Sequence, residues 1–264
     1  MSPTVPPFER VGKLVARPWG AQCMSLRFFR SALASLSILT LLVPSAASGL
    51  PMLRRRKGGA APDFAEILSR MNDSAKRLKS LTANLEYTTV TVLVDDKSTQ
   101  YGRLFFRKDK KPEILIKFEK PDPKVILFRR NKAEIYNPKI NQIQEYDVEP
   151  RSELVQQFLL LGFGTEVADL KKSYGLKFTG EEEILDETAA VLELTPLHKD
   201  IAGQLSKVEL WISEESWLPM QQKFTQPGGD YLIARYSSTK VNRNIPASTF
   251  QIEAPAGAKR VKMN

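Results

Sequence analysis

The chain has little of the chemistry that enzymes and metal sites use. Among its 264 residues are one cysteine, Cys23, and one histidine, His198. A single cysteine excludes an intramolecular disulfide and a cysteine-rich metal site. His198 lies in a loop-like stretch and no Gly-x-Ser-x-Gly motif occurs, so a Ser-His-Asp hydrolase is not indicated. We predict a protein that is not an enzyme and has no cofactor and no metal.

The acidic run Glu181–Glu183 does not change that prediction. Consecutive residues of a strand point to opposite faces, so the run offers no acid/base pair. We expect the run to be a solvated sheet edge. Loose binding of a cation is the alternative.

The positive charge of the chain is concentrated near its start. The net charge is +9, and residues 1–47 hold five basic residues and one acidic residue, which leaves +5 for the rest. In that remainder basic and acidic residues are interleaved, so nucleic-acid binding is not indicated.

An export signal is predicted near the start of the chain. The apolar run Ser31–Val43 follows Arg27 and Arg30 and precedes the small residues Ser45–Gly49. It is shorter than the roughly 20 residues of a membrane-spanning helix. This order of segments is typical of a secretory signal peptide, so we assign residues 1–49 to it. An uncleaved anchor is the alternative.

The remaining boundaries follow from composition. Met24 is a second candidate for the start of translation. Residues 50–62 are basic and rich in Gly and Ala, which predicts a flexible linker. We expect residues 63–264 to form a single domain.

A helix is predicted directly after this linker. Asp63 and Glu66 are three residues apart, which is typical of an N-terminal capping box. The apolar residues on one helical face are Phe64, Ile67, Leu68, Met71, Ala75 and Leu78. We expect this face to pack on the strands that follow.

Strands with turns between them make up most of the remaining sequence. Ser80–Val94 is rich in β-branched residues, with a turn predicted at Asp95–Lys97. In Tyr101–Asp147 apolar and polar residues alternate, with Pro and Asn between the runs. The later predictions are strands at Leu176–Thr179, Ala190–Thr195, Lys207–Ile212, Met220–Thr225, Tyr231–Val241 and Phe250–Glu253, and a hairpin turn at Pro227–Asp230.

A helical segment interrupts the strands. Glu153–Phe163 has apolar residues at helical spacing, and Thr165 is a candidate cap for a second short helix before Tyr174. Strands joined by short turns favour an antiparallel sheet, and a long sheet must curl or close. We predict an α+β, mainly β fold: a curled antiparallel sheet that forms an unclosed β-barrel, covered by the N-terminal helix and a helical lid insertion. The concave face is either filled by side chains as core or left partly open for an apolar ligand, and composition does not choose between the two outcomes. From the residues alone, we expect a filled core.

A series of short motifs runs along the chain in a fixed order. The first are Gly102–Phe106, Lys111-Pro112, a strand ending at Pro121, Asn131-Lys132 and Ile135–Pro138. The later ones are Val208–Ile212, Glu214-Glu215, Leu218-Pro219, Ile245-Pro246, Phe250 and Ala254–Gly257. In order and spacing these motifs resemble the LolA family of periplasmic outer-membrane lipoprotein carriers. The resemblance covers about residues 63–261.

The resemblance implies a hydrophobic cavity for the acyl chains of a lipoprotein and no enzymatic activity. Each buried CH₂ contributes about 0.8 kcal/mol, so such chains do not cross an aqueous compartment unaided. It also implies a periplasmic location and acylated lipoproteins as cargo. The implied partners are an inner-membrane ABC lipoprotein exporter and an outer-membrane receptor; we expect a monomer.

The resemblance and the alternating pattern together indicate the cavity residues. They are Leu104, Phe106, Ile114, Ile116 and Phe118 of the strands, and Leu154, Phe158 and Leu159 of the lid. Each is as compatible with plain core as with ligand contact. Lys111 stands where the family has an Arg that tethers the lid, so it is the predicted tether, with a point charge in place of a planar fork.

One alternative function keeps the same fold. The chain would then be a lipid- or lipoprotein-sensing regulatory module similar to the sigma-factor regulator RseB. Recovery of an anti-sigma factor but no transporter in a pull-down would favour this alternative.

Overall fold

The computed structural model of the chain describes residues 62–108, 111–147 and 161–263. The predicted signal region and almost all of the predicted linker lie outside them. The chain divides into two units, one of residues 1–17 and 63–264 and one of residues 18–62. Of the second only Pro62 is described, so the fold below is that of the first unit.

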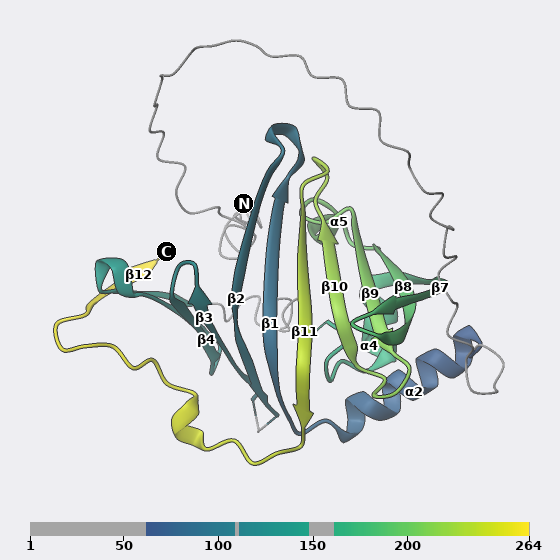
Figure 1. The fold of residues 1–264 in the computed structure, drawn as a ribbon, viewed down its shortest axis with the longest axis horizontal. Helices are drawn as coiled ribbons and strands as arrows, with labels where there is room; N and C mark the ends of the chain where they lie inside the picture. The colour runs from purple at the N-terminus through teal and green to yellow at the C-terminus, as the bar shows by residue number, and fades with distance from the viewer. Residues whose placement is uncertain (1–61, 109–110, 148–160, 264) are drawn as a thin grey trace, which may run out of the picture. The chain divides into compact units, whose positions relative to one another are not determined.

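The described residues form one curled, unclosed sheet of twelve strands (Figure 1). Its order is β12-β6-β5-β4-β3-β2-β1-β11-β10-β9-β8-β7, and every pair is antiparallel except β12 with β6. The strands are β1 (Ser80–Thr91), β2 (Asp96–Arg107), β3 (Glu113–Lys120), β4 (Lys124–Arg129), β5 (Lys132–Asn137), β6 (Gln142–Asp147), β7 (Tyr174–Ile184), β8 (Glu187–Pro196), β9 (Lys207–Ser213), β10 (Pro219–Thr225), β11 (Tyr231–Val241) and β12 (Lys259–Met263). The predicted fold class is confirmed.

Helix α2 (Phe64–Arg77) begins where the capping box predicts. The side chain of Asp63 accepts a hydrogen bond from the Glu66 backbone N–H at 2.7 Å. The apolar face of α2 packs into the main core through Ile67, Leu68 and Met71. Short helices α4 (Val167–Ser173) and α5 (Lys199–Ala202) and the 3-10 turns η1 (Val92–Val94), η2 (Pro138–Ile140) and η4 (Ala247–Thr249) complete the described elements. Within this described part, none of the helices has the length and apolarity needed to cross a membrane.

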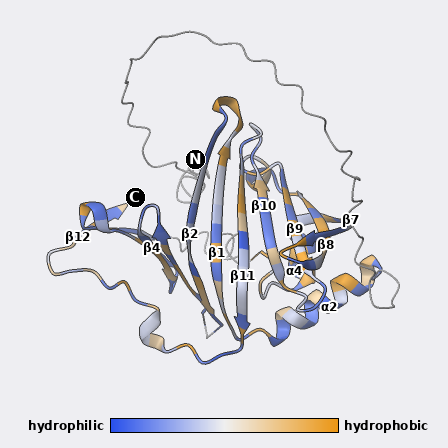
Figure 2. Cartoon of the chain, viewed as in Figure 1, coloured by the Kyte–Doolittle hydropathy of each residue, from blue (hydrophilic) through white to orange (hydrophobic). Residues whose placement is uncertain are grey.

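The turn between β1 and β2 lies earlier than predicted. β1 ends at Thr91, and η1 is closed by Asp95 in the left-handed conformation with φ of 49°. The Val92 N–H donates to Asp230 Oδ1 at 2.9 Å, which holds this tip beside the turn between β10 and β11. The β-branched run therefore contains the turn, and its apolar tip is exposed (Figure 2).

Two further local predictions are wrong. Phe250–Glu253 is not a strand, because Phe250 follows η4 and is buried against the outer face of the sheet. The last strand is β12 instead. Helix α4 has Glu166, not Thr165, as its N-cap. The hairpin turn at Pro227–Asp230 is confirmed between β10 and β11.

Alternation along the strands gives the sheet two different faces. The concave face forms one continuous core cluster that reaches from β7 to β5 and includes α2. The outer face has two small apolar clusters. One joins Leu115 and Leu127 to Ile245 and Phe250, and the other contains Val191 and Trp211.

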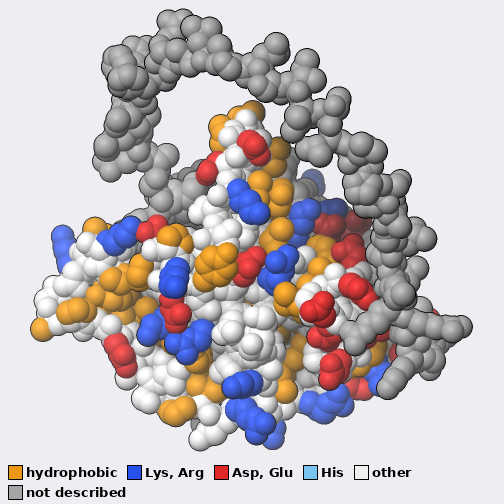
Figure 3. All heavy atoms as spheres, viewed as in Figure 1, with side chains coloured by type: hydrophobic (Ala, Val, Ile, Leu, Met, Phe, Trp, Pro, Cys, Tyr) orange, Lys and Arg blue, Asp and Glu red, His pale blue; other side chains and the backbone are white. Residues whose placement is uncertain are grey.

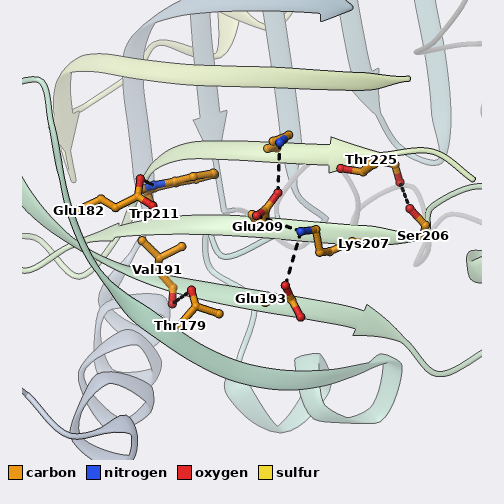
Figure 4. A network of polar contacts seen from close by, with 10 residues as sticks. Thr179, Glu182, Val191, Glu193, Ser206, Lys207, Glu209, Trp211 and Thr225 are labelled. Atoms are coloured by element: carbon orange, nitrogen blue, oxygen red, sulfur yellow. Dashed lines mark hydrogen bonds and ion pairs between the residues drawn. The ribbon is translucent and has the colours of Figure 1, made fainter. Parts of the chain in front are cut away.

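The outer face also carries ion pairs. Lys207 of β9 contacts Glu193 of β8 at 3.5 Å and Glu209 at 3.1 Å, and Lys223 of β10 contacts Glu209 at 3.5 Å (Figure 4). Arg235 of β11 contacts Glu86 of β1 at 3.2 Å. Acidic and basic side chains are accordingly interspersed over the central strands in Figure 3.

Candidate functional site

The concave face of the sheet is the candidate site. The register pairs Leu104 with Ile116 and Phe106 with Ile114 across β2 and β3, so these side chains lie on the same face. Phe118 belongs to the same cluster. Leu104, Phe106, Ile114 and Phe118 are 1–4% exposed, and Ile116 is partly buried against them. The structure thus brings together the strand residues that the alternation indicates.

The predicted lid residues are placed differently. Leu154, Phe158 and Leu159 lie outside the described residues. Lys111 is exposed in the connection between β2 and β3, and it forms no hydrogen bond or ion pair with another described residue. Its role as a tether stays a prediction.

A turn at residues 161–164 is held on the concave face by a buried polar network. Gln222, 2% exposed, donates from Nε2 to the Leu161 carbonyl, and its Oε1 accepts from the Tyr236 hydroxyl at 2.8 Å. The rings of Phe163 and Tyr236 meet edge to face at 4.8 Å. A Cβ on Gly162, which has φ of 81°, would lie 2.6 Å from Pro219 Cγ. Sequence reasoning missed this network, because nothing in the sequence around Gln222 indicates that its side chain is buried.

The motif Gly102–Phe106 requires glycine at its first position. The register of β2 and β3 shifts between Tyr101 and Gly102, which is a β-bulge. A Cβ at Gly102 would lie 2.2 Å from the carbonyl oxygen of Lys117, so only glycine fits. Near this glycine the rings of Tyr87 and Phe118 meet edge to face at 5.6 Å.

Buried phenols add polar groups to the apolar face. Burial raises the pKa of Tyr236, with a further contribution from Tyr87, and burial raises the pKa of Tyr87 well above its ordinary value. Burial also raises the pKa of Tyr174 to about 12. These hydroxyls therefore stay protonated at neutral pH, and that of Tyr236 donates a hydrogen bond inside the core.

Lys124 is a charged residue on this face that sequence reasoning did not select. It is the cross-strand partner of Phe118, and its Nζ lies 4.8 Å from the centre of that ring. Burial lowers the pKa of Lys124, although the charge of Asp122 opposes this shift. The signal was available: Lys124 continues the alternation of Ile126 and Phe128 at the concave positions of β4.

The residues considered for catalysis lie elsewhere. His198 is exposed at the start of α5, with Nε2 at 3.0 Å from the Lys172 carbonyl oxygen. Glu182 accepts a hydrogen bond from Trp211 Nε1 at 2.7 Å on the outer face (Figure 4). Over the described residues, no three His, Cys, Asp or Glu side chains are grouped to hold a metal ion.

The described part of the chain is thus a curled, unclosed sheet with a continuous apolar concave face and helix α2 packed on it. The family described as outer membrane lipoprotein carrier protein LolA matches residues 76–253, which is more than half of the chain. The chain belongs to this family, whose members are carrier or binding proteins. No curated protein matches it in sequence.

Several solved structures are similar to the chain at low sequence identity. An uncharacterized conserved protein from Thermus thermophilus is 14% identical with a TM-score of 0.49, over 75% of this chain and 98% of that one. MucB in the MucA/MucB complex of Pseudomonas aeruginosa is 13% identical with a TM-score of 0.44, over 72% of this chain and 60% of that one. The LolA superfamily protein NE2245 from Nitrosomonas europaea is 15% identical with a TM-score of 0.38, over 73% of this chain and 99% of that one.

Proposed function

We propose that this protein is a periplasmic carrier that binds the acyl chains of lipoproteins on the concave face of its sheet and moves them from the inner to the outer membrane. Membership of the family supports the class of cargo. The observation that carries the proposal is the convergence of Leu104, Phe106, Ile114, Ile116 and Phe118 on one apolar face. Lipoproteins, an ABC exporter and an outer-membrane receptor are the proposed partners.

The proposal follows from the cost of exposing alkyl chains to water. A carrier must remove each CH₂ from water, which contributes about 0.8 kcal/mol. The apolar concave face is wide, because its cluster spans strands on both sides of β1. The sheet is unclosed, with β7 and β12 at its two edges, so its curvature can change without breaking a ladder between strands.

Uptake of a fluorescent fatty acid and of a fluorescent triacylated lipopeptide by delipidated protein tests the proposal. We expect saturable binding of both probes. Ile116→Asn places an amide on the concave face and should weaken binding by about fivefold or more, because a buried unpaired amide costs about 1–3 kcal/mol. The matched control is Val125→Asn, a partly buried residue of the outer face.

Two outcomes would contradict the proposal. One is the absence of acyl binding by protein that circular dichroism shows to be folded. The other is equal loss of binding in both variants, which would show that the concave face has no special role. Recovery of acylated lipoproteins with the protein from periplasm would support the carrier role over a sensing module.

A further inference from the structure

One end of the sheet carries a group of basic side chains. It is the end where α2 leads into β1 and where β2 and β11 finish (Figure 1). Backbone hydrogen bonds hold these segments together: the Lys108 N–H donates to the Lys79 carbonyl at 2.7 Å, and the Asn242 N–H donates to the Ser80 carbonyl at 2.8 Å. The exposed basic residues here, which we call the basic end, are Lys76, Arg77, Lys79, Lys108, Lys111, Lys240 and Arg243.

The charge of the basic end is largely unbalanced within the described part of the chain. None of its seven side chains forms an ion pair with a described carboxylate. Glu113, close to Lys111 in the sequence, is paired with Arg107. Asp73 of α2, and Glu215 next to the Ser216 carbonyl that Ser74 contacts, remain as nearby carboxylates. Figure 3 shows Lys and Arg side chains at this lower end of the molecule.

The opposite end of the same strands has a different character. The turn between β1 and β2 carries Asp95 and Asp96 beside Lys97, and the neighbouring turn carries Asp230. The tip itself is apolar, with Leu93 93% exposed. Charge is therefore distributed unevenly along the strands, and the field of an anionic surface would turn the basic end towards it.

The composition of the basic end favours a lipid surface over a protein partner. Protein interfaces are depleted in Lys and enriched in aromatic residues, whereas most of these cations are Lys. A lysine is a point charge on a flexible stem, so lysines from separate segments can each reach a phosphate of a lipid surface. A shallow pocket of about 210 Å³ at this end has no aromatic residue in its lining, which consists of Ser74, Arg77, Leu78, Ser216, Leu218, Val241 and Asn242.

We propose that the basic end binds the surface of a bilayer that contains anionic phospholipid. Each lysine close to such a surface strengthens binding by about fivefold, so several unpaired lysines are enough for reversible attachment. The concave face begins at the same end, where Leu78 and Phe106 both approach Gly164. Attachment would therefore bring this end of the concave face close to the lipid. The inference does not depend on which ligand the concave face binds.

Sedimentation with vesicles at low salt tests the inference. One set is pure phosphatidylcholine, and the other is an equal mixture of phosphatidylcholine and phosphatidylglycerol. The basic run before the described residues is neutralised in every protein, so that it cannot mask the effect, by Arg54→Gln, Arg55→Gln, Arg56→Gln and Lys57→Gln. We expect this parent protein to bind the anionic vesicles and not the neutral ones, and high salt to release it.

Two triple variants of equal charge locate the surface. Lys79→Gln with Lys108→Gln and Lys240→Gln should weaken binding to anionic vesicles by about a hundredfold, because three lysines are lost from the basic end. The matched control replaces three exposed lysines that lie elsewhere and form no ion pair with a described residue: Lys97→Gln, Lys117→Gln and Lys259→Gln. Its binding should stay within about fivefold of the parent.

A fluorescent label reports which end meets the lipid. The polarity-sensitive fluorophore NBD is attached to Asn244→Cys at the basic end or to Ser98→Cys at the opposite end, both with Cys23→Ser. Anionic vesicles should shift the emission of the first to the blue and leave the second unchanged. Equal losses in the two triple variants, or a shift at Ser98→Cys alone, would overturn the inference. Binding of polyglutamate but not of anionic vesicles would overturn it in favour of an acidic protein partner.

Discussion

The two faces of the sheet use apolar residues in different ways. The concave face is one continuous cluster, with buried hydroxyls and an amide placed inside it. The outer face has two small clusters and several ion pairs, and the C-terminal segment around Phe250 covers one of the clusters.

This difference separates stability from binding. Outer-face contacts are local and involve paired charges, so they fix the register of particular strands. The concave face is apolar over a large area, and on it the Oε1 atom of Gln100 has no hydrogen-bond partner among the described residues. We therefore expect outer-face variants to change stability alone, and concave-face variants to change binding as well.

The largest effect on stability is expected at Phe250, in the C-terminal segment that covers one outer-face cluster. Phe250 is fully buried on Leu115 and Leu127, and its carbonyl accepts from Arg129 at 3.0 Å. Phe250→Ala should lower the free energy of unfolding by about 3–5 kcal/mol in urea denaturation, because a large cavity replaces the ring. Acyl affinity should stay within twofold. Ile140→Ala, at an exposed position, is the control, and loss of affinity in Phe250→Ala would break the comparison.

A somewhat smaller effect is expected at Gly102 of β2, which lies at the bulge between β2 and β3. Gly102→Ala should cost about 3 kcal/mol, because the added Cβ meets a backbone carbonyl that can move only with its strand. Since this bulge lies next to Tyr87 and Phe118, acyl binding should fall too. Gly228→Ala, where a Cβ meets nothing within 4 Å, should change neither property. Equal effects of the two variants would contradict this reasoning.

The buried network of Gln222 should matter less. Gln222→Met leaves the Leu161 carbonyl and the Tyr236 hydroxyl without their partner, at a cost of about 1–3 kcal/mol. Thermal unfolding measures the loss. In Gln222→Met with Tyr236→Phe the second substitution should cost little, because the hydroxyl has already lost its partner. Strict additivity of the two losses would show that they do not form one network.

The smallest effect is expected from an exposed ion pair. Arg103 and Glu119 are 3.0 Å apart, with side chains 54% and 43% exposed. Glu119→Gln should change the free energy of unfolding by less than about 0.5 kcal/mol, because water and salt screen such pairs. Urea denaturation at low and high salt checks this, and a loss above about 1 kcal/mol would show that outer-face charges matter more than we infer.

Much of the fold could be predicted from the sequence because its signals are local. Alternation in Tyr101–Asp147 and the capping box at Asp63 both depend on neighbouring residues, and both are confirmed. The turn at Val92–Val94 could not be predicted, because a β-branched run favours a strand and the contact with Asp230 comes from a distant hairpin. Phe250 was misassigned since its burial depends on the outer face of distant strands.

The candidate site could be predicted only in part, because some of its features depend on contacts between residues far apart in the sequence. The apolar strand residues follow from alternation, but Gln222 becomes informative only once the structure shows that it is buried, and Gln100 only once its Oε1 atom is seen to be buried. In the sequence Lys124 is one of many charged residues, and only the register of β3 and β4 shows that it lies over Phe118. The predicted lid residues lie outside the described part of the chain.

The central claim is that the concave face, and not the outer face, binds acyl chains. Isoleucine methyl NMR with isotope-labelled palmitate tests it directly, because the two faces carry different isoleucines. We predict intermolecular NOEs from the chain to Ile114, Ile116 and Ile126 of the concave face, and none to Ile245 and Ile252 of the outer face. NOEs to Ile245 and Ile252, without any to the concave isoleucines, would contradict the claim.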